Sequence, residues 1–175
     1  MKRSRKIALI SMGVSTLALA ACEEAKTEAS IFRTVAECVQ SGQFTAKQCE
    51  HAQAYAISEH DMAAPRYKTK EDCEAVAGKG QCEHLEGTRR EPGTYRPGIA
   101  AFMFAASRSV YPQPLYRKAG SPGQFTTADG RRVPARIGRV TIPQSAAARP
   151  TSKIHTATRS GFGSTTRSFS TTGRS

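Results

Sequence analysis

The chain repeats FRTVAEC, at residues 32–38, as YKTKEDC, at residues 67–73. In both copies an aromatic residue and a base precede a threonine, and an acid and a cysteine follow it. Downstream, QCEH recurs at residues 48–51 and 81–84. The copies are offset by 35 residues at the first cysteine and by 33 at the second. This duplication predicts two similar structural units, and it decides the fold that we expect.

Each unit is expected to begin with a short helix. Thr34 and Thr69 stand three residues before an acid, which is the spacing of a capping box that closes the first turn of a helix. The longest predicted helix runs over residues 45–62 and ends before Pro65, because proline cannot continue a helix. The sequence therefore predicts a compact helical unit over residues 30–84.

Four cysteines lie within the repeats, and an even number in an exported chain indicates disulfides. Three pairings are open. The simplest joins Cys38 to Cys49 and Cys73 to Cys82, so that each unit holds one disulfide. Closing loops of this size should stabilise the fold by about 3 kcal/mol each.

A metal site that uses these cysteines with His51 and His84 is the competing interpretation. Zinc sites favour cysteine pairs separated by about two to four residues, whereas the gaps here are ten and eight. A cysteine nucleophile would need a free thiol. We therefore expect no metal, no cofactor and no catalytic residue in the repeats, and interpret each Cys-Glu-His as a copied helix start with solvated polar side chains.

Residues 1–21 have the pattern of a signal peptide. Four bases precede residues 7–20, which carry no charge and are too few to span a bilayer. Leu19-Ala-Ala-Cys22 resembles the lipobox of bacterial lipoproteins, so Cys22 is expected to carry acyl chains such as palmitate. Position 23 is Glu rather than Asp. By resemblance to Gram-negative lipoproteins, this favours the inner leaflet of the outer membrane, facing the periplasm; anchoring in the inner membrane is the alternative.

Length and charge bound the function. The chain has 175 residues, 26 Lys and Arg against 14 Asp and Glu, and a net charge of +12. This length excludes a large enzyme. With 23% charged and 38% hydrophobic residues, the composition also excludes a polytopic membrane protein. Residues 22–91 have a net charge of −4, and residues 92–175 a net charge of +12. A basic chain is a common sign of nucleic-acid binding, but export removes that partner, so we expect none.

We expect a small mainly α domain with two disulfide-stapled helical repeats, followed by an irregular segment with a short β-hairpin and a disordered basic tail. The expected parts are a signal peptide (1–21), a lipidated tether (22–30), the helical repeat domain (31–91), a segment with a short apolar helix, a Pro-rich loop and the hairpin (92–145), and the tail (146–175).

Three patterns fall within residues 92–145. Gly98–Ala106 reads GIAAFMFAA and is expected to be a short buried helix, with a membrane- or partner-facing patch as the alternative. Residues 111–116 are predicted to form the Pro-rich loop. Residues 124–133 form the predicted hairpin, with Asp129-Gly130 as its turn, and residues 139–142 a further strand.

The most consistent function is that of a non-enzymatic, lipid-anchored docking or scaffold protein. Its basic arm would bind anionic lipid, lipopolysaccharide or an acidic envelope protein. A periplasmic metal-binding protein or enzyme that uses Glu50, His51, Glu83 and His84 is the alternative, and the sequence makes no prediction of the oligomeric state. The candidate residues of the arm are Arg131, Arg132, Arg136, Arg139, Arg149, Arg159, Arg167 and Arg174.

The order of these motifs resembles the YgiB family of uncharacterised bacterial envelope proteins. The resemblance rests on the lipobox, on Thr69-Lys-Glu-Asp-Cys73, and on Gly161-Phe-Gly163 near the end. It covers essentially the whole chain that follows the signal peptide. It implies a location in the cell envelope and a shared architecture, and it implies no activity.

Overall fold

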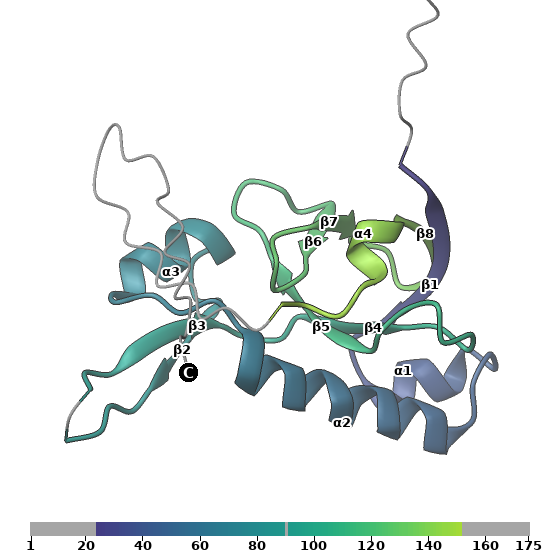
Figure 1. The fold of residues 1–175 in the computed structure, drawn as a ribbon, viewed down its shortest axis with the longest axis horizontal. Coiled ribbons are helices and arrows are strands. Elements are labelled where there is room, and N and C mark those ends of the chain that lie inside the picture. The colour runs from purple at the N-terminus through teal and green to yellow at the C-terminus, as the bar shows by residue number, and fades with distance from the viewer. Residues whose placement is uncertain (1–23, 90, 152–175) are drawn as a thin grey trace, which may run out of the picture.

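The computed structural model describes residues 24–89 and 91–151, and these form mainly a β structure (Figure 1). This corrects the expected mainly α fold. The elements are β1 (Lys26–Phe32), α1 (Val35–Gln40), α2 (Ala46–Ala63), α3 (Lys70–Ala77), β2 (Cys82–Leu85), β3 (Thr94–Pro97), β4 (Ala101–Phe104), β5 (Gln113–Arg117), β6 (Gln124–Thr126), β7 (Arg132–Pro134), β8 (Gly138–Pro143) and α4 (Gln144–Ala147).

A six-stranded antiparallel sheet organises the molecule. Its strand order is β7-β6-β5-β4-β1-β8, and β2 pairs with β3 in a separate hairpin. The sheet curls until its two edge strands, β7 and β8, lie beside each other, so that it is nearly closed (Figure 1). One core cluster joins apolar side chains of β1, β4, β5, β8 and α4, including Ile31, Met103, Leu115 and Ile142. Helices α1 and α2 pack on the outer face of the sheet.

Strand β4 replaces the helix that we expected at Gly98–Ala106. All four of its residues are buried. Ala101 and Met103 belong to the core cluster inside the sheet, whereas Phe102 and Phe104 pack with Phe32 against α1 and α2. Because both faces of the strand are covered, the sequence shows no alternation of apolar and polar residues. A short apolar run of this kind does not distinguish a buried strand from a helix.

Strand β1 begins inside the segment that we expected to be a tether. Lys26 lies opposite Pro143 of β8, and Phe32 lies opposite Phe102 of β4. These partners are more than 65 residues away in the sequence, so no local sequence pattern predicts the strand. Strand β5 likewise replaces most of the predicted Pro-rich loop, since Gln113–Arg117 pair with β4 and β6.

The helices of the repeats agree better with the prediction from the sequence. Thr34, Thr45 and Thr69 accept hydrogen bonds from the backbone amides three residues later, and Thr45 with Gln48 forms a complete capping box. Disulfides join Cys38 to Cys49 and Cys73 to Cys82. The second Cys-Glu-His departs from the expected helix start, because Cys82–Leu85 form β2 and pair with β3.

The predicted hairpin and final strand are confirmed. β6 and β7 are antiparallel, and the turn between them contains Gly130 with a φ of 77°, a conformation that glycine adopts without strain. Strand β8 spans the predicted strand at 139–142. Most of the predicted tail lies outside the described residues. No helix among residues 24–89 and 91–151 combines the length and the hydropathy needed to cross a bilayer.

Candidate functional site

The structure places the described arginines of the predicted site in three groups. Cys22, Arg159, Arg167 and Arg174 lie outside the described residues. The arginines that it does place fall at separate positions: Arg131 and Arg132 near the start of β7, Arg136 and Arg139 around the start of β8, and Arg149 beyond α4. They do not form one patch.

The first group lies where the chain enters the sheet. The Glu24 carboxylate accepts a hydrogen bond from the backbone amide of Ser145, at 2.9 Å, and the amide of Gln144 donates to the carbonyl of Ala25. Hydrogen bonds from Ser145 and the nearby charge of Arg131 lower the pKa of Glu24. Arg131 and Arg132 are both exposed. Glu24, α4 and these two arginines therefore share one side of the molecule.

The second group lies at the other end of β8. Arg139 is opposite Ser30 in the register of β1 and β8, four residues along β1 from Lys26. The guanidinium of Arg136 donates a hydrogen bond to the carbonyl of Arg139, at 3.1 Å. Both side chains are exposed. We call Arg136 and Arg139 the far-end arginines.

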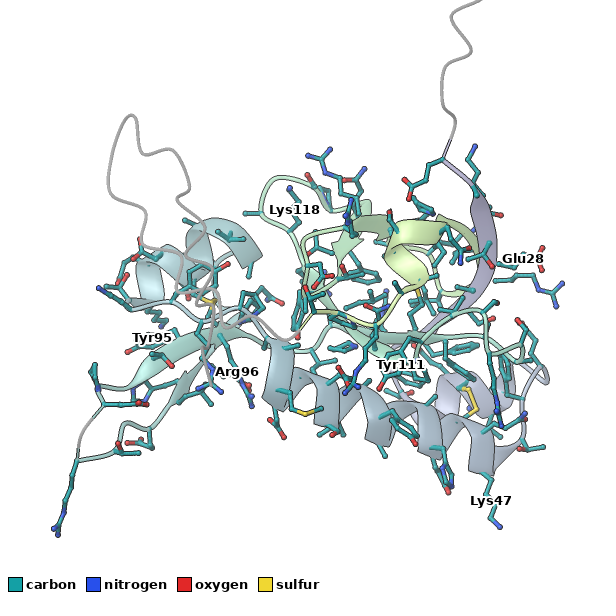
Figure 2. The ribbon with its side chains drawn as sticks, viewed as in Figure 1. Glu28, Lys47, Tyr95, Arg96, Tyr111 and Lys118 are labelled. Carbon is teal, nitrogen blue, oxygen red and sulfur yellow. A yellow bond between two sulfur atoms is a disulfide. The ribbon has the colours of Figure 1, made fainter. Side chains whose placement is uncertain are left out.

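Arg149 forms an ion pair with the buried Glu59 and so does not contribute to a free basic surface. Its Nε and Nη2 both donate to Oε1 of Glu59 on α2, at 3.1 and 2.7 Å. The Tyr111 hydroxyl donates to the same oxygen, at 3.0 Å, and the Arg149 guanidinium lies 5.2 Å from the centre of the Tyr111 ring. Glu59 is only 3% exposed. This contact fixes the chain that follows α4 against α2, and Figure 2 labels Tyr111 above that helix.

A second polar network centres on His60, the next residue of α2. Its Nδ1 lies 3.0 Å from the Tyr116 hydroxyl on β5, and its Nε2 lies 2.9 Å from Oε1 of Glu83 on β2. Arg96 of β3 donates to Glu83 and, at 2.8 Å, to Oδ1 of Asp61. The network therefore connects α2, the large sheet and the small hairpin. Figure 2 shows Arg96 at this junction.

Burial controls the titration of this network. Desolvation lowers the pKa of His60 below its ordinary value of 6.5, and it outweighs the hydrogen bond to Glu83 that acts in the opposite direction. For Glu83, burial raises the pKa, but hydrogen bonds from His60 and Arg96 prevail and lower it. Desolvation also raises the pKa of Tyr116. The native network is therefore built around a neutral imidazole and an ionised carboxylate.

His60 and Asp61 lie near the end of the helix predicted over residues 45–62, where polar residues need no special role, and Glu83 was expected to be solvated. Their contacts depend on β3 and β5, which come later in the chain. The one signal that could have indicated the site is the histidine on the buried face of α2, in line with Ala52, Ala56 and Ala63.

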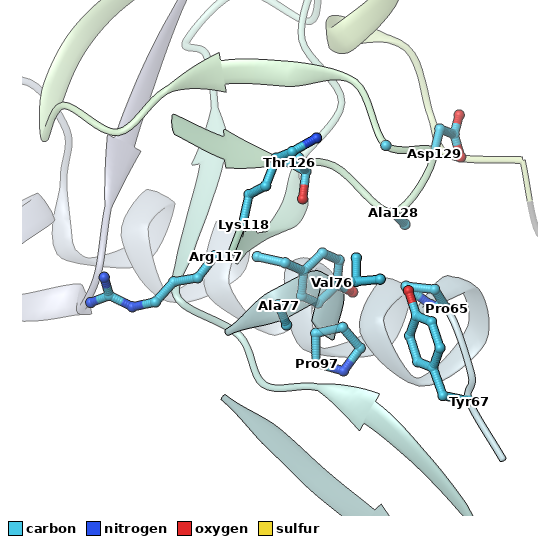
Figure 3. A pocket seen from close by; sticks show the side chains of 12 residues that line it. Pro65, Tyr67, Val76, Ala77, Pro97, Arg117, Lys118, Thr126, Ala128 and Asp129 are labelled. Carbon is cyan, nitrogen blue, oxygen red and sulfur yellow. The ribbon is translucent and has the colours of Figure 1, made fainter. Parts of the chain in front are cut away.

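Tyr116 also lines a pocket of about 310 Å³, which Figure 3 shows from close by. Apolar side chains such as Tyr67, Val76 and Pro97 line it, and Lys118 and Asp129 are among its few charged residues. This is the composition of a pocket that holds an apolar group. The hydroxyl of Tyr116 is directed to His60, so this wall of the pocket presents an aromatic ring.

The residues of the metal-binding alternative are not brought together as a ligand set. Glu50 and His51 are exposed on α2, whereas Glu83 binds His60 and Arg96, and His84 packs on the Tyr95 ring at 4.9 Å between centroids. The part of the chain that the structure describes contains no group of three or more His, Cys, Asp or Glu placed to hold a metal ion. Both cysteine pairs are disulfides.

Comparison with known proteins connects the chain to a family that has no assigned activity. Residues 26–173 match the family described as "Protein of unknown function (DUF1190)". The chain belongs to this family, and the resemblance to YgiB proteins is thereby confirmed.

Three curated relatives illustrate the match. A UPF0441 protein of Pectobacterium atrosepticum is 32% identical over 184 residues, which cover 93% of this chain and 82% of the relative. A UPF0441 protein of Photorhabdus laumondii is 30% identical over 204 residues, covering 99% and 87%. One from Klebsiella pneumoniae is 28% identical over 193 residues, covering 98% and 86%. No solved structure matches the chain.

Proposed function

We propose that this protein is a bacterial envelope lipoprotein that acts without catalysis as a membrane-anchored docking or scaffold protein. Acyl chains on Cys22 hold it in the inner leaflet of the outer membrane. The sheet domain faces the periplasm, and basic residues of the C-terminal half, residues 92–175, contact anionic lipid, lipopolysaccharide or an acidic envelope protein. The observation that carries the proposal is Leu19-Ala-Ala-Cys22 at the end of a basic and then apolar leader.

The position of the first strand supports this proposal. Strand β1 begins at Lys26, four residues after Cys22. A domain that starts so close to an acylated residue would lie against the membrane surface rather than at the end of a long tether. The two disulfides also suit the oxidising periplasm.

The buried polar network supports a binding role over catalysis. Both ring nitrogens of His60 are used inside the fold, by Tyr116 and by Glu83. A general base needs a nitrogen within reach of a substrate proton. The pocket beside Tyr116 is mainly apolar, which favours binding an apolar segment or molecule.

Metabolic labelling with palmitate tests the anchoring. We expect the label on the protein and its complete loss in Cys22→Ala, while Cys38→Ala/Cys49→Ala retains it. Density separation of the two membranes then tests the location, with the label expected in the outer-membrane fraction. Equal labelling of Cys22→Ala would contradict the proposal.

A further inference from the structure

The path of the chain after Cys22 sets which side of the domain approaches the membrane. Only Glu23 separates Cys22 from Glu24, and two residues span at most about 7 Å. Glu24 is in turn fixed to Ser145 at the start of α4, and Ala25 to Gln144. Anchoring at Cys22 would therefore bring the surface around the start of α4 within a few ångströms of the lipid head groups.

Two arginines lie on that surface. Arg131 is close enough to Glu24 for its charge to act on that carboxylate, and Arg132 is the first residue of β7. Figure 1 shows β7 next to α4 and β8. Both side chains are exposed, and neither forms an ion pair within 4 Å in the described part of the chain. We call Arg131 and Arg132 the anchor-side arginines.

We infer that the anchor-side arginines bind the phosphate groups of anionic phospholipids in the leaflet that holds Cys22, and so fix the orientation of the domain on the membrane. This inference rests on the proposed lipid anchoring. Arginine presents a planar set of donors that matches a phosphate. Its attraction to an anionic surface is lost beyond a Debye length, about 8 Å at physiological salt, so only bases beside the anchor take part.

The far-end arginines provide the contrast. Arg139 is opposite Ser30, about 13 Å along β1 from Lys26 at roughly 3.3 Å per residue. Arg136 and Arg139 are exposed, like the anchor-side pair, and carry the same charge. They therefore make a matched control, in which an equal change of net charge occurs beyond the reach of the surface potential.

A photocrosslinking experiment on the acylated full-length mature protein tests the orientation. Gln144→p-benzoylphenylalanine places the probe beside the anchor, and Lys47→p-benzoylphenylalanine places it on α2, at the opposite side of the molecule in Figure 2. Both positions are exposed. The proteins are reconstituted in vesicles of phosphatidylcholine alone or with phosphatidylglycerol, and the lipid-crosslinked fraction is measured.

We expect lipid crosslinks from position 144 in phosphatidylglycerol vesicles and few from position 47. Arg131→Gln/Arg132→Gln should lower the yield from position 144 at least about threefold, because each base near an anionic surface contributes to binding. Arg136→Gln/Arg139→Gln should leave it unchanged. Equal yields from both probes, or equal effects of both arginine pairs, would overturn the inference while leaving the anchoring intact. A protein that carries no acyl chain would overturn both.

Discussion

At the scale of single residues, His60 shows how a buried histidine couples folding to pH. Its native pKa lies below 6.5 because burial penalises the imidazolium. The unfolded chain therefore binds more protons than the native chain as the pH falls through 6.5, and the free energy of unfolding falls with it. The lowered pKa of Glu83 adds a loss of stability in the same direction at more acidic pH.

We predict that His60→Gln lowers stability at pH 7.5 and flattens its dependence on pH between 7.5 and 5.5. Urea unfolding at several pH values measures this. His51→Gln is the control, because His51 is exposed on the same helix. If His60→Gln kept the full pH dependence of the unmodified protein, another group would be responsible.

Glu59 and Arg149 differ in burial, and this predicts unequal effects of their substitution. Glu59 is 3% exposed at its side chain and Arg149 58%. Arg149→Gln leaves a buried carboxylate without its cation, whereas Glu59→Gln leaves a guanidinium that water can solvate. We therefore expect Arg149→Gln to be the more destabilising.

The double variant Glu59→Gln/Arg149→Gln should be about as stable as Glu59→Gln alone, because the cost of the unpaired charge is gone. Chemical unfolding of all four proteins provides the cycle. Equal losses in the two single variants, with simple addition in the double variant, would contradict the role given to this ion pair.

At the scale of elements, the sequence predicted what local patterns determine. The threonine caps at Thr34 and Thr69, the long helix and the Asp129-Gly130 turn depend on residues a few positions apart, and all are present. Strands β1 and β4 were not predicted, because they form by pairing with each other across about 70 residues of sequence, and β1 pairs also with β8. Because β4 is buried on both sides, its sequence shows no alternation of apolar and polar residues. Residues 26–30 of β1 are mostly polar and do not have the pattern of a buried strand. The His60 network was missed for the same reason.

Strand β4 yields a direct test of its assigned faces. Phe102 is 1% exposed and packs between the sheet and the helices, whereas Ile99, in the same apolar run, is 38% exposed. Phe102→Ala should cost about 3–5 kcal/mol of unfolding free energy, and Ile99→Ala less than about 1 kcal/mol. Equilibrium urea unfolding compares the two. Similar costs at both positions would place the run in a different structure.

At the scale of the whole molecule, the fold separates basic residues that contribute to the net charge of +12. One predicted member of the basic arm, Arg149, forms an internal ion pair with Glu59. Arg131 and Arg132 lie beside the point where the chain comes from Cys22, and Arg136 and Arg139 lie at the other end of β8. The described arginines of the predicted arm therefore lie at three separate positions in the fold.

The proposed function depends on Cys22 being the acylated first residue of the mature protein. Mass spectrometry of the N-terminal peptide from protein purified out of membranes tests it most directly. We expect a peptide that begins at Cys22 and carries a diacylglyceryl group and an amide-linked acyl chain. A peptide that begins at any other residue, or an unmodified Cys22 thiol, would contradict it.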